Sequence, residues 1–366
     1  MTGVIVHEWI EEIGGSENVL DEIALVFPDA PIYCLWNDAP ERFAPGRVRE
    51  SWLAKTPLRK VKPLALLFMP FVWRRLKIDF QPDWILASTH LFAHHAKFVG
   101  IKPVNKFAYV HSPARYIWSP ELDSRGKSIF VRLVAPVLKA IDTKRAKELS
   151  SIAANSSTVQ SRIQKYWNRD SRVIYPPVDV DFFKEGNTQL SSDEKLVLES
   201  LPETFVLGAS RFVPYKRLDL ALKYGKVTQL PVVLAGNGPD YADLVTLSEM
   251  SPGDHIQIIQ SPSSQLLKAL FTKAKVLVFG AVEDFGIMPV EAMAAGTPVI
   301  GPTVGGVSET VLDGKTGILL AEFSEKEIIA ADASLGAISE KACVHRADEF
   351  SSEQFRQQLR EWVTPA

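Results

Sequence analysis

Two carboxylates occupy an otherwise apolar stretch, VFGAVEDFGIMPVEAMAAGTPVIG, which runs from Val278 to Gly301. Glu283 follows an apolar run, and Glu291 begins an Ala- and Met-rich segment. A segment of this composition favours burial, but a carboxylate resists burial unless another group pairs with it. The pattern therefore predicts a site at which a bound molecule satisfies both glutamates.

Two cations lie in the segment FVLGASRFVPYKRLDLAL, where a strand pattern ends and a helix pattern begins. Arg211 offers a planar fork of N–H donors, and Lys216 offers a point charge. Both groups suit the oxygens of a diphosphate. A solvated basic loop is the alternative interpretation, but the two glutamates in the same half of the chain favour a site.

Gly14 and Gly15 follow the first strand pattern and precede a helix that is expected to begin at Ser16. Glycine allows backbone amides to approach an anion, and a helix N-terminus adds a partial positive charge. The same pattern is equally typical of a tight strand-to-helix turn.

The stretch YVHSPARYIWSPELD places His111 at the end of another strand pattern. Pro113, Arg115, Tyr116 and Trp118 follow in what we expect to be a non-helical loop. Functional residues are frequent in loops at strand ends. A purely structural plug is the alternative interpretation.

Candidate metal ligands are less convincing. Asp179 and Asp181 form a D-x-D pattern, but they lie in an expected linker, where aspartates usually face solvent or cap turns. His90, His94 and His95 have no carboxylate ligand in their own segment, so packed or surface histidines are favoured. We therefore expect neither a metal nor a cofactor.

The elements that must position these residues are short Val- and Ile-rich runs, each followed by a helix-sized segment. This alternation is typical of parallel, doubly wound sheets. Strand patterns occur at 3–9, 30–36, 83–88, 106–112, 204–210, 230–236, 255–260, 275–281 and 297–302. Helical patterns occur at 16–27, 129–150, 216–226 and 263–272.

The series occurs twice, with a break at 173–194 that contains tandem prolines and a polar stretch. We predict two Rossmann-like domains, 1–180 and 181–345, and a final helix at 346–366 that packs back on the first domain. In open parallel sheets, ligands bind beyond the carboxyl ends of the strands, which is where the candidate residues lie.

Composition bounds the function. A chain of 366 residues exceeds a single core, and a net charge of -2 gives no overall field that attracts nucleic acid. Cys34 and Cys343 form neither a disulfide framework nor a zinc spacing. The N-terminus lacks the features of a signal peptide, and the apolar run 64–73 is too short to span a membrane. We expect a soluble, cytoplasmic protein.

One segment, 48–80, interleaves basic residues with Trp, Phe, Leu and Met and has almost no acids before Asp79. A mixed basic and apolar surface suits an anionic bilayer interface, so peripheral binding to the inner face of the plasma membrane is one interpretation. The other is that the apolar residues are core and the cations merely face solvent.

Taken together, EDFGIMPVEAMAAGTPVI and GASRFVPYKR resemble the retaining glycosyltransferases of family 4. The resemblance extends over nearly the whole chain and implies a GT-B fold, in which two Rossmann-like domains face a central cleft. By this likeness the first domain binds the acceptor and the second the nucleotide sugar. It also implies that the donor-binding residues are Gly14, Gly15, Arg211, Lys216, Glu283, Phe285, Gly286, Ile287 and Glu291.

The resemblance further implies roles. Glu283 binds the donor sugar, Glu291 the ribose hydroxyls, and Arg211 with Lys216 stabilises the leaving diphosphate without a metal. His111 lines the donor sugar from the first domain. Arg115, Tyr116 and Trp118 are candidates for acceptor binding.

The N-terminal stretch and HSPARYIW are most similar to mannosyltransferases of surface polysaccharide and glycolipid synthesis, which implies GDP-mannose and a glycan or lipid-linked acceptor. Ser119-Pro120 departs from the acidic residue expected after Trp118, so UDP- or dTDP-sugars stay open. A nucleotide-sugar epimerase and a non-catalytic binder are the alternatives. A dehydrogenase is disfavoured, because LAGNGPDY lacks the full dinucleotide fingerprint.

Overall fold

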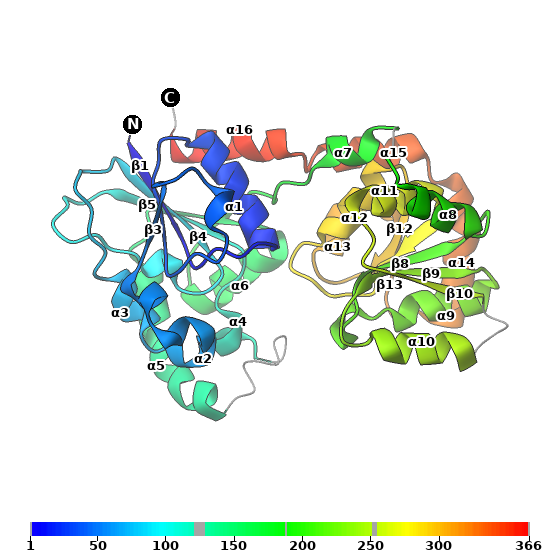
Figure 1. Ribbon diagram of the computed structural model, residues 1–366, viewed down its shortest axis with the longest axis horizontal. Helices are drawn as coiled ribbons and strands as arrows, with labels where there is room; N and C mark the ends of the chain where they lie inside the picture. Colours follow the sequence, from blue (N-terminus) through cyan, green and yellow to red (C-terminus); the bar gives the residue numbers. More distant parts are fainter. Residues whose placement is uncertain (1, 121–128, 187–188, 251–254, 365–366) are drawn as a thin grey trace. The chain divides into compact units, whose positions relative to one another are not determined.

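The computed structural model describes residues 2–120, 129–186, 189–250 and 255–364. Its contacts divide the chain into two compact units. Unit 1 comprises Met1–Pro177 and Phe355–Ala366, and unit 2 comprises Val178–Gln354. Each unit is a parallel sheet with helices packed on it (Figure 1).

The sheet of unit 1 has the strand order β3-β2-β1-β4-β5-β6-β7. All of its paired strands are parallel. The chain order changes direction between β1 and β4, which is the position where ligands bind in sheets of this type. The strands are β1 (Gly3–His7), β2 (Ile32–Cys34), β3 (Val48–Glu50), β4 (Trp84–Thr89), β5 (Asn105–Val110), β6 (Ser151–Ala154) and β7 (Arg172–Val173).

The helices of unit 1 bury one apolar stripe each. In α1, Val19, Leu20 and Ile23 recur at helical spacing and join the core beneath the sheet. The α-helices are α1 (Gly15–Val26), α2 (Lys62–Ala65), α3 (Met69–Trp73), α4 (Arg115–Trp118), α5 (Ile129–Ala146) and α6 (Ser157–Trp167). The 3-10 helices are η1 (Pro40–Arg42), η2 (Trp52–Lys55), η3 (Pro57–Lys60) and η4 (Ala93–His95).

The last helix, α16 (Ser352–Val363), contributes to the core of unit 1. Phe355, Leu359 and Trp362 lie on one face of the helix and are buried in the same cluster as α1. The indole Nε1 of Trp362 donates to Ser151 Oγ at 2.8 Å. The C-terminal end of the chain therefore completes the unit that the N-terminal end begins.

The sheet of unit 2 has the order β10-β9-β8-β11-β12-β13, again with parallel pairing. Its strands are β8 (Val206–Arg211), β9 (Val232–Asn237), β10 (Ile256–Gln260), β11 (Val276–Val278), β12 (Val299–Pro302) and β13 (Gly317–Leu320). The α-helices are α7 (Val180–Lys184), α8 (Ser192–Ser200), α9 (Asp219–Thr228), α10 (Tyr241–Met250), α11 (Ser264–Lys273), α12 (Ile287–Ala294), α13 (Val307–Thr310), α14 (Glu325–Ser334) and α15 (Glu340–Asp348). Within its described residues, unit 2 also contains the 3-10 helices η6 (Pro214–Lys216) and η7 (Leu335–Ala337).

Each strand expected from the sequence is present, and so are the four expected helices. The short strands β3, β6, β7 and β13 were not expected. One expectation is wrong: Arg115–Trp118, expected as a non-helical loop after His111, forms the helical turn α4. The proline at 113 lies ahead of this turn, so its missing N–H interrupts no helical hydrogen bond.

Candidate functional site

Two of the predicted donor-site residues, Lys216 and Glu283, lie together at the carboxyl edge of the sheet in unit 2. Lys216 belongs to η6 after β8, and Glu283 lies in the loop after the neighbouring strand β11. The Lys216 ammonium forms an ion pair with the Glu283 carboxylate, with side chains only 10% and 24% exposed. The structure thus brings Lys216, the cation predicted to bind the phosphate, into direct contact with Glu283, the carboxylate predicted to bind the sugar.

Arg211 is the last residue of β8 and is exposed. Its Nη2 donates to the hydroxyl of Tyr215 at 2.6 Å, which holds the guanidinium beside the same edge. Both predicted cations therefore lie at the carboxyl end of β8 or in the segment that follows it. Of the two, Lys216 is the one paired with Glu283.

The loop that carries Glu283 is held by a second glycine pair, which the sequence analysis did not identify. Gly306 donates its N–H to the Glu283 carbonyl at 2.8 Å. A Cβ on Gly306 would lie 2.2 Å from Phe285 Cα, and Gly305 adopts a φ of +83°. Only glycine fits this approach, because any side chain would collide with the backbone of the Glu283 loop.

Phe285, Gly286 and Ile287 form the entry to α12. Gly286 is the N-cap residue with a left-handed φ of 89°, and Ile287 begins the helix. The Phe285 ring is buried and packs edge-on against Phe350, so the side chain supports the loop. What this segment can offer a ligand is the backbone at a helix N-terminus, where partial positive charge accumulates.

Glu291 lies within α12, C-terminal to that entry. Burial, and secondarily the negative charge of Asp179, raise the pKa of Glu291 to about 7. Asp179 itself caps α7, accepting from the N–H of Phe182 at 3.2 Å. The D-x-D pattern thus includes a helix cap, and its first aspartate influences the glutamate predicted to bind ribose.

In unit 1, Gly14 is the N-cap residue of α1, and Gly15 is its first helical residue. Gly14 is extended, so its φ alone does not require glycine. A Cβ at Gly14 would lie 2.0 Å from Oε2 of Glu17, so a larger residue here would displace the end of the Glu17 side chain. Glu17 is buried, and although burial acts to raise its pKa, His7 and the Ser16 hydroxyl lower it to about 2.

His111 follows β5 and belongs to a chain of polar side chains at the carboxyl edge of this sheet. Its Nε2 lies 2.8 Å from Ser88 Oγ, and Ser88 Oγ lies 3.1 Å from His7 Nδ1. Burial, with the neighbouring His90 and His7, lowers the pKa of His111 to about 3. His111 is therefore neutral at physiological pH.

Glu8 is a further buried carboxylate that the sequence analysis did not identify. Its Oε1 accepts from Thr89 Oγ1 at 2.9 Å and from the N–H groups of Leu91 and Ala93 at 2.9 and 2.8 Å. These bonds fix the loop after β4, which contains His90. In the sequence, nothing distinguishes His7, Glu8 and Ser88 from other residues of a strand. They become candidate site residues only because β1 and β4 are neighbours and end at the same edge of the sheet.

The three acceptor candidates lie in α4. Trp118 Nε1 donates to Asp142 Oδ2 at 2.7 Å, and its ring stacks on Tyr166 with centroids 4.8 Å apart. The indole thus serves packing. Arg115 and Tyr116 are partly exposed, and both stay candidates for ligand contact.

Among the described residues, one group has the geometry for a metal ion: His94, His95 and Asp142. All three are buried in the core of unit 1. Oδ1 of Asp142 lies 3.0 Å from His94 Nε2 and 2.9 Å from His95 Nε2, and Oδ2 accepts from the indoles of Trp118 and Trp167. His95 and the two indoles make hydrogen bonds to Asp142, whereas His94 Nε2 and His95 Nδ1 have no hydrogen-bond partner within the described residues. Both histidines are packed in the core, which agrees with the expectation of packed histidines at 94 and 95.

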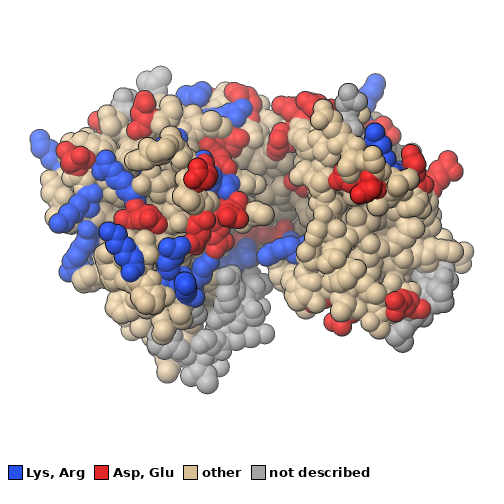
Figure 2. Space-filling model, in the orientation of Figure 1, with Lys and Arg blue, Asp and Glu red and all other residues tan. Residues whose placement is uncertain are grey.

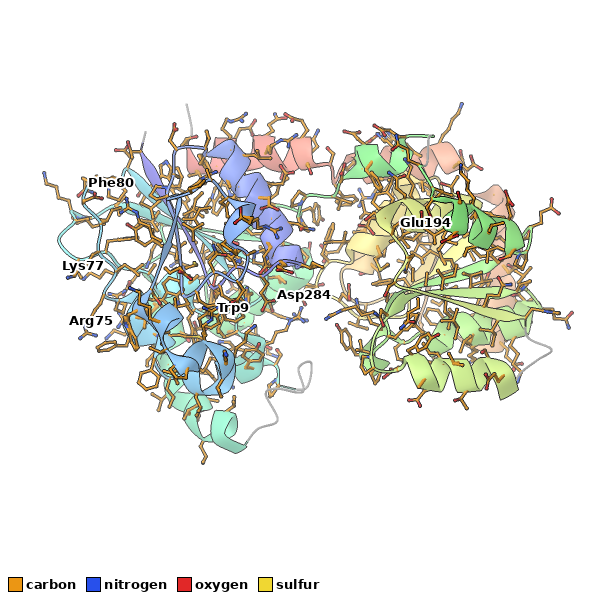
Figure 3. The ribbon with its side chains drawn as sticks, in the orientation of Figure 1. Trp9, Arg75, Lys77, Phe80, Glu194 and Asp284 are labelled. Carbon is orange, nitrogen blue, oxygen red and sulfur yellow. The ribbon has the colours of Figure 1, made fainter. Side chains whose placement is uncertain are left out.

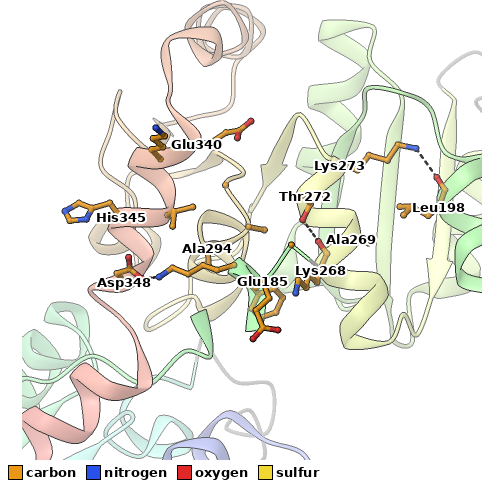
Figure 4. A pocket seen from close by; sticks show the side chains of 17 residues that line it. Glu185, Leu198, Lys268, Ala269, Thr272, Lys273, Ala294, Glu340, His345 and Asp348 are labelled. Carbon is orange, nitrogen blue, oxygen red and sulfur yellow. Dashed lines mark hydrogen bonds and ion pairs between the residues drawn. The ribbon is translucent and has the colours of Figure 1, made fainter. Parts of the chain in front are cut away.

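A pocket of about 740 Å³ lies in unit 2 between α7, α11 and α15 (Figure 4). Lys268 on its wall is almost fully buried, with Nζ 5.0 Å from the Phe182 ring centroid. The described residues that line this pocket include none of the predicted donor-site residues.

The basic and apolar segment 48–80 divides between core and surface. Leu66 and Trp73 are buried in the core, whereas Trp52, Phe68 and Phe71 are exposed. An exposed apolar face, defined here as the apolar face of unit 1, continues onto α5; its members, between 43% and 74% exposed, are Trp52, Val61, Leu64, Leu67, Phe68, Phe71, Leu133 and Val137.

Cations accompany this face. Figure 2 shows Lys and Arg gathered over the part of unit 1 that carries α2 and α3, with some acids among them. Arg75 and Lys77 point away from the sheet (Figure 3), and Arg75 lies 3.5 Å from the centroid of the Phe71 ring. Arg59 and Arg74 instead pair with Asp38 and Glu148. None of the helices within the described ranges is long and apolar enough to cross a bilayer.

Comparison with family models matches both halves of the chain. Residues 13–182 match the model described as Glycosyltransferase Family 4, and residues 171–342 match that described as Glycosyl transferases group 1. Together the two matches run from residue 13 to residue 342.

Among curated relatives, the chain is 29% identical over 208 residues to the alpha-1,3/1,6-mannosyltransferase alg-2 of Neurospora crassa, covering 46% of this chain and 44% of the relative. It is 30% identical over 199 residues to a D-inositol 3-phosphate glycosyltransferase of Mycobacterium sp. strain JLS, covering 50% and 44%. The chain thus spans less than half the length of these relatives.

Solved structures share the architecture over the full length. HepE from Anabaena, in complex with UDP and glucose, superimposes with a TM-score of 0.68 at 20% identity and covers 100% of both chains. WaaG, a glycosyltransferase involved in lipopolysaccharide biosynthesis, gives a TM-score of 0.63 at 13% identity with the same coverage. These likenesses establish the fold: two parallel-sheet, Rossmann-like units, as expected from the sequence.

Proposed function

We propose that this chain, which belongs to the group 1 and family 4 glycosyltransferases with a GT-B fold, is a retaining glycosyltransferase that moves a sugar from a nucleotide-sugar donor to a glycan or lipid-linked acceptor. The observation that carries this proposal is the contact between Lys216 and Glu283 at the edge of the sheet in unit 2. It places a cation and a sugar-binding carboxylate side by side at the point where parallel sheets bind ligands.

The reaction needs stabilisation of negative charge. When the bond from the anomeric carbon to the diphosphate breaks, charge develops on the phosphate and an oxocarbenium-like sugar forms. We assign phosphate stabilisation to Lys216 and Arg211, with the N-termini of α12 and α1 as further donors. We propose that these groups act without a metal, so excess EDTA should leave the rate intact; loss of activity that Mg²⁺ or Mn²⁺ restores would overturn this.

The two glutamates bind hydroxyl groups. A carboxylate accepts hydrogen bonds on two oxygens, so Glu283 suits the donor sugar and Glu291 suits the vicinal hydroxyls of ribose. Donor binding would replace the ammonium of Lys216 as the partner of Glu283. His111, assigned to the donor sugar by family resemblance, supplies a neutral imidazole.

The stereochemical course follows from the groups available. A double-displacement mechanism needs a free carboxylate nucleophile, whereas we assign Glu283 to hydroxyl groups of the donor sugar. We therefore propose attack by the acceptor hydroxyl on the face from which the diphosphate departs, with a phosphate oxygen taking the hydroxyl proton. The anomeric configuration is then retained.

For the donor, we propose GDP-mannose. Support comes from the mannosyltransferase alg-2 among the curated relatives. UDP-glucose is the second candidate, because HepE has been solved in complex with UDP-glucose. Either nucleotide would occupy the same groups, since the diphosphate and the ribose are common to both.

For the acceptor, we propose a lipid-linked glycan presented at an anionic bilayer, to which the apolar face of unit 1 binds. Eight large apolar side chains are exposed here, and four of them, Leu67, Phe71, Leu133 and Val137, line one groove. Contiguous exposed apolar surface usually marks an interaction site. The neighbouring cations Lys60, Arg75 and Lys77 are exposed and suit an anionic headgroup layer. A peripheral location on the inner face of the plasma membrane follows from this proposal.

A panel of GDP-, UDP-, dTDP- and ADP-sugars in a thermal-shift assay tests the donor proposal. A ligand that binds only the folded state at a hundred times its Kd stabilises it by about 2.7 kcal/mol. Stabilisation should be largest with GDP-mannose and should be lost in Lys216→Ala. A panel in which no nucleotide sugar raises the melting temperature would contradict the proposal.

A further inference from the structure

The pocket between α7, α11 and α15 has no part in the proposed function. Its volume of about 740 Å³ lies within the range of small-molecule sites, which is roughly 300–1,000 Å³. The described residues that line it all belong to unit 2, so the pocket lies within one compact unit. It is therefore a candidate site in its own right.

Lys268, on α11, is a buried cation on the wall of this pocket (Figure 4). The residue is only 2% exposed, and its Nζ lies 5.0 Å from the centroid of the Phe182 ring. Within the described residues, the ammonium group has neither a hydrogen-bond acceptor nor an ion-pair partner. A ring face attracts a cation but leaves the three N–H donors of a lysine without acceptors. Burial of such a group is costly unless another molecule satisfies it.

Two other cations at the pocket differ from Lys268, because the chain itself supplies their partners. Lys184 forms an ion pair with Asp348. Lys273 Nζ donates to the Leu198 carbonyl at 2.9 Å, a bond that Figure 4 shows as a dashed line. Of these three lysines, Lys268 is thus the one whose N–H donors are left for a ligand.

Three carboxylates also line the pocket, but none of them neutralises Lys268. Asp348 is paired with Lys184, and Glu185 and Glu340 are exposed. Neither of these two glutamates forms an ion pair with Lys268 within the described residues. Charges on exposed groups are screened by water and salt, whereas a buried charge is screened much less. The buried charge on the pocket wall is positive, and it favours an anionic ligand.

The size and the apolar part of the wall narrow the class of anion. Apolar side chains that line the pocket are Phe183, Leu198, Ala269, Ala294 and Val344. A water molecule can solvate an ammonium group in such a pocket, but it offers no charge and no contact with the apolar wall. An inorganic ion offers the charge alone. An organic anion, in which an apolar body carries a phosphate or a carboxylate, satisfies both parts of the wall.

We propose that this pocket binds a small organic anion, whose phosphate or carboxylate group contacts the ammonium of Lys268 and whose body lies against the apolar wall. The pocket is separate from the proposed donor site. Ala294, at the C-terminal end of α12, lines the pocket, whereas Gly286 and Ile287 lie at the N-terminal end of this helix. The ligand is therefore not the nucleotide sugar of the proposed reaction, and this proposal stands whether or not that reaction occurs.

Titration calorimetry of the full chain with four probes tests the proposal. Phenyl phosphate and benzoate join an apolar ring to the two kinds of anionic group, whereas benzyl alcohol has the ring without the charge and inorganic phosphate has the charge without the ring. We expect at least one of the two organic anions to bind more tightly than both controls, and the tighter one identifies the anionic group. Binding of neither organic anion, or equal binding of either control, would overturn the proposal.

Variants locate the bound anion. Lys268→Met removes the ammonium, keeps an unbranched apolar side chain, and should weaken binding of the tighter organic anion at least about tenfold, the scale of one hydrogen bond to a charged group. Lys326→Met removes an exposed cation on α14 and is the matched control, which should bind as the wild type does. Lys216→Ala should also bind as the wild type does. A loss in Lys216→Ala with none in Lys268→Met would place the anion at the donor site and refute the assignment.

Stability gives a second readout that needs no ligand. Lys268→Met should unfold at a higher urea concentration than the wild type, because it no longer buries an ammonium without a partner, whereas Lys326→Met should not. A lower midpoint in Lys268→Met would show that the Phe182 ring already satisfies the ammonium, and would overturn the proposal. The organic anion should raise the midpoint of the wild type but not that of Val344→Phe, which fills the pocket and keeps Lys268. An equal rise in both proteins would place the anion elsewhere.

Discussion

The ammonium group of Lys216 forms an ion pair with the carboxylate of Glu283, although the two residues are 67 positions apart in the chain. The parallel sheet causes this contact, because β8 and β11 are neighbours and both loops leave the same edge. By the proposed function, the donor contacts Lys216 with its phosphate and Glu283 with its sugar. The two residues are therefore expected to act as a coupled pair.

Removal of either cation should lower turnover. Lys216→Ala and Arg211→Ala are each expected to reduce kcat by roughly 10²–10³-fold, the scale for the loss of one charge contact in a transition state. Steady-state kinetics measures this. Wild-type rates in both variants would remove the diphosphate assignment.

The same two variants should differ in stability. Arg211 is exposed, so Arg211→Ala should change the free energy of unfolding by less than about 0.5 kcal/mol. Lys216→Ala leaves the Glu283 carboxylate partly buried without its partner, which should cost about 1–2 kcal/mol. Adding Glu283→Gln to Lys216→Ala should recover most of this loss in urea unfolding; no recovery would show that the pair is not coupled.

Glu291 should make both stability and donor affinity depend on pH near neutrality. Its pKa is raised from 4.5 to about 7 in the folded protein, so the folded state binds the proton more tightly than the unfolded chain. Stability from this group is present at low pH and is lost as pH rises from 4.5 through 7. Glu291→Gln, which stays neutral, should therefore stabilise the protein at pH 8 by about 2 kcal/mol.

Donor binding should respond to Glu291 in the opposite sense. Only the ionised carboxylate accepts hydrogen bonds from both ribose hydroxyls, so affinity for the nucleotide should increase as pH rises from 6 to 8. Titration calorimetry with wild type and Glu291→Gln tests this. A pH-independent affinity in the wild type would contradict the role of Glu291 at the ribose.

The core network around Asp142 should make unit 1 sensitive to acid. Burial, together with His94, lowers the pKa of His95 from 6.5 to about 4, so the unfolded chain takes up a proton on this residue before the folded chain does. Stability from His95 is complete above pH 6.5 and is lost as pH falls toward 4. Urea unfolding of His95→Gln between pH 7 and pH 4 should show a smaller loss than the wild type.

Asp142→Asn addresses the same network at neutral pH. An amide offers one acceptor oxygen where the carboxylate serves His94, His95, Trp118 and Trp167. The variant should lose about 3 kcal/mol of unfolding free energy, because buried donors are left without partners. An unchanged unfolding free energy would show that the four contacts contribute little.

Binding to anionic liposomes tests the apolar face of unit 1. Lys60, Arg75 and Lys77 changed together to Ser should weaken co-sedimentation with anionic vesicles, since each cation near such a surface contributes about 1 kcal/mol. These three are preferred to Arg59 and Arg74, whose ion pairs with Asp38 and Glu148 support the fold.

A control for this experiment is available in unit 2. Lys195, Lys315 and Lys326 are exposed and, when changed to Ser, alter the net charge by the same amount. This control should bind as the wild type does. Equal binding by all three proteins, or none by the wild type at low salt, would favour an acceptor free in solution.

Much of the fold can be predicted from the sequence, because strands buried on both faces are continuous Val- and Ile-rich runs. The strands that were missed are short or polar: β3 has the sequence VRE, and β7 spans only Arg172–Val173. Such strands form because a neighbouring strand offers its free edge. That is tertiary information, which local sequence does not contain.

Part of the candidate site can also be predicted from the sequence. Glu283, Arg211 and Lys216 lie in loops after strands, where a polar residue in an apolar setting is conspicuous. His7 and Ser88 are not conspicuous, since a polar residue inside a strand pattern resembles any partly exposed position. Their significance arises from strand order, which brings residues 81 positions apart into hydrogen-bond contact. The need for glycine at Gly305 and Gly306 likewise becomes evident only from the loop that packs against them.

The most direct test of the central claim is the anomeric configuration of the transferred sugar. The purified protein is incubated with a lipid-linked acceptor and with GDP-mannose or another nucleotide sugar of the panel. Proton NMR then records the anomeric configuration of the first product formed. We predict consumption of the α-linked donor and an α-linked product, with Lys216→Ala forming at least a hundred times less in the same period. A β-linked product, or no consumption of any donor in the panel, would contradict the assignment of a retaining glycosyltransferase.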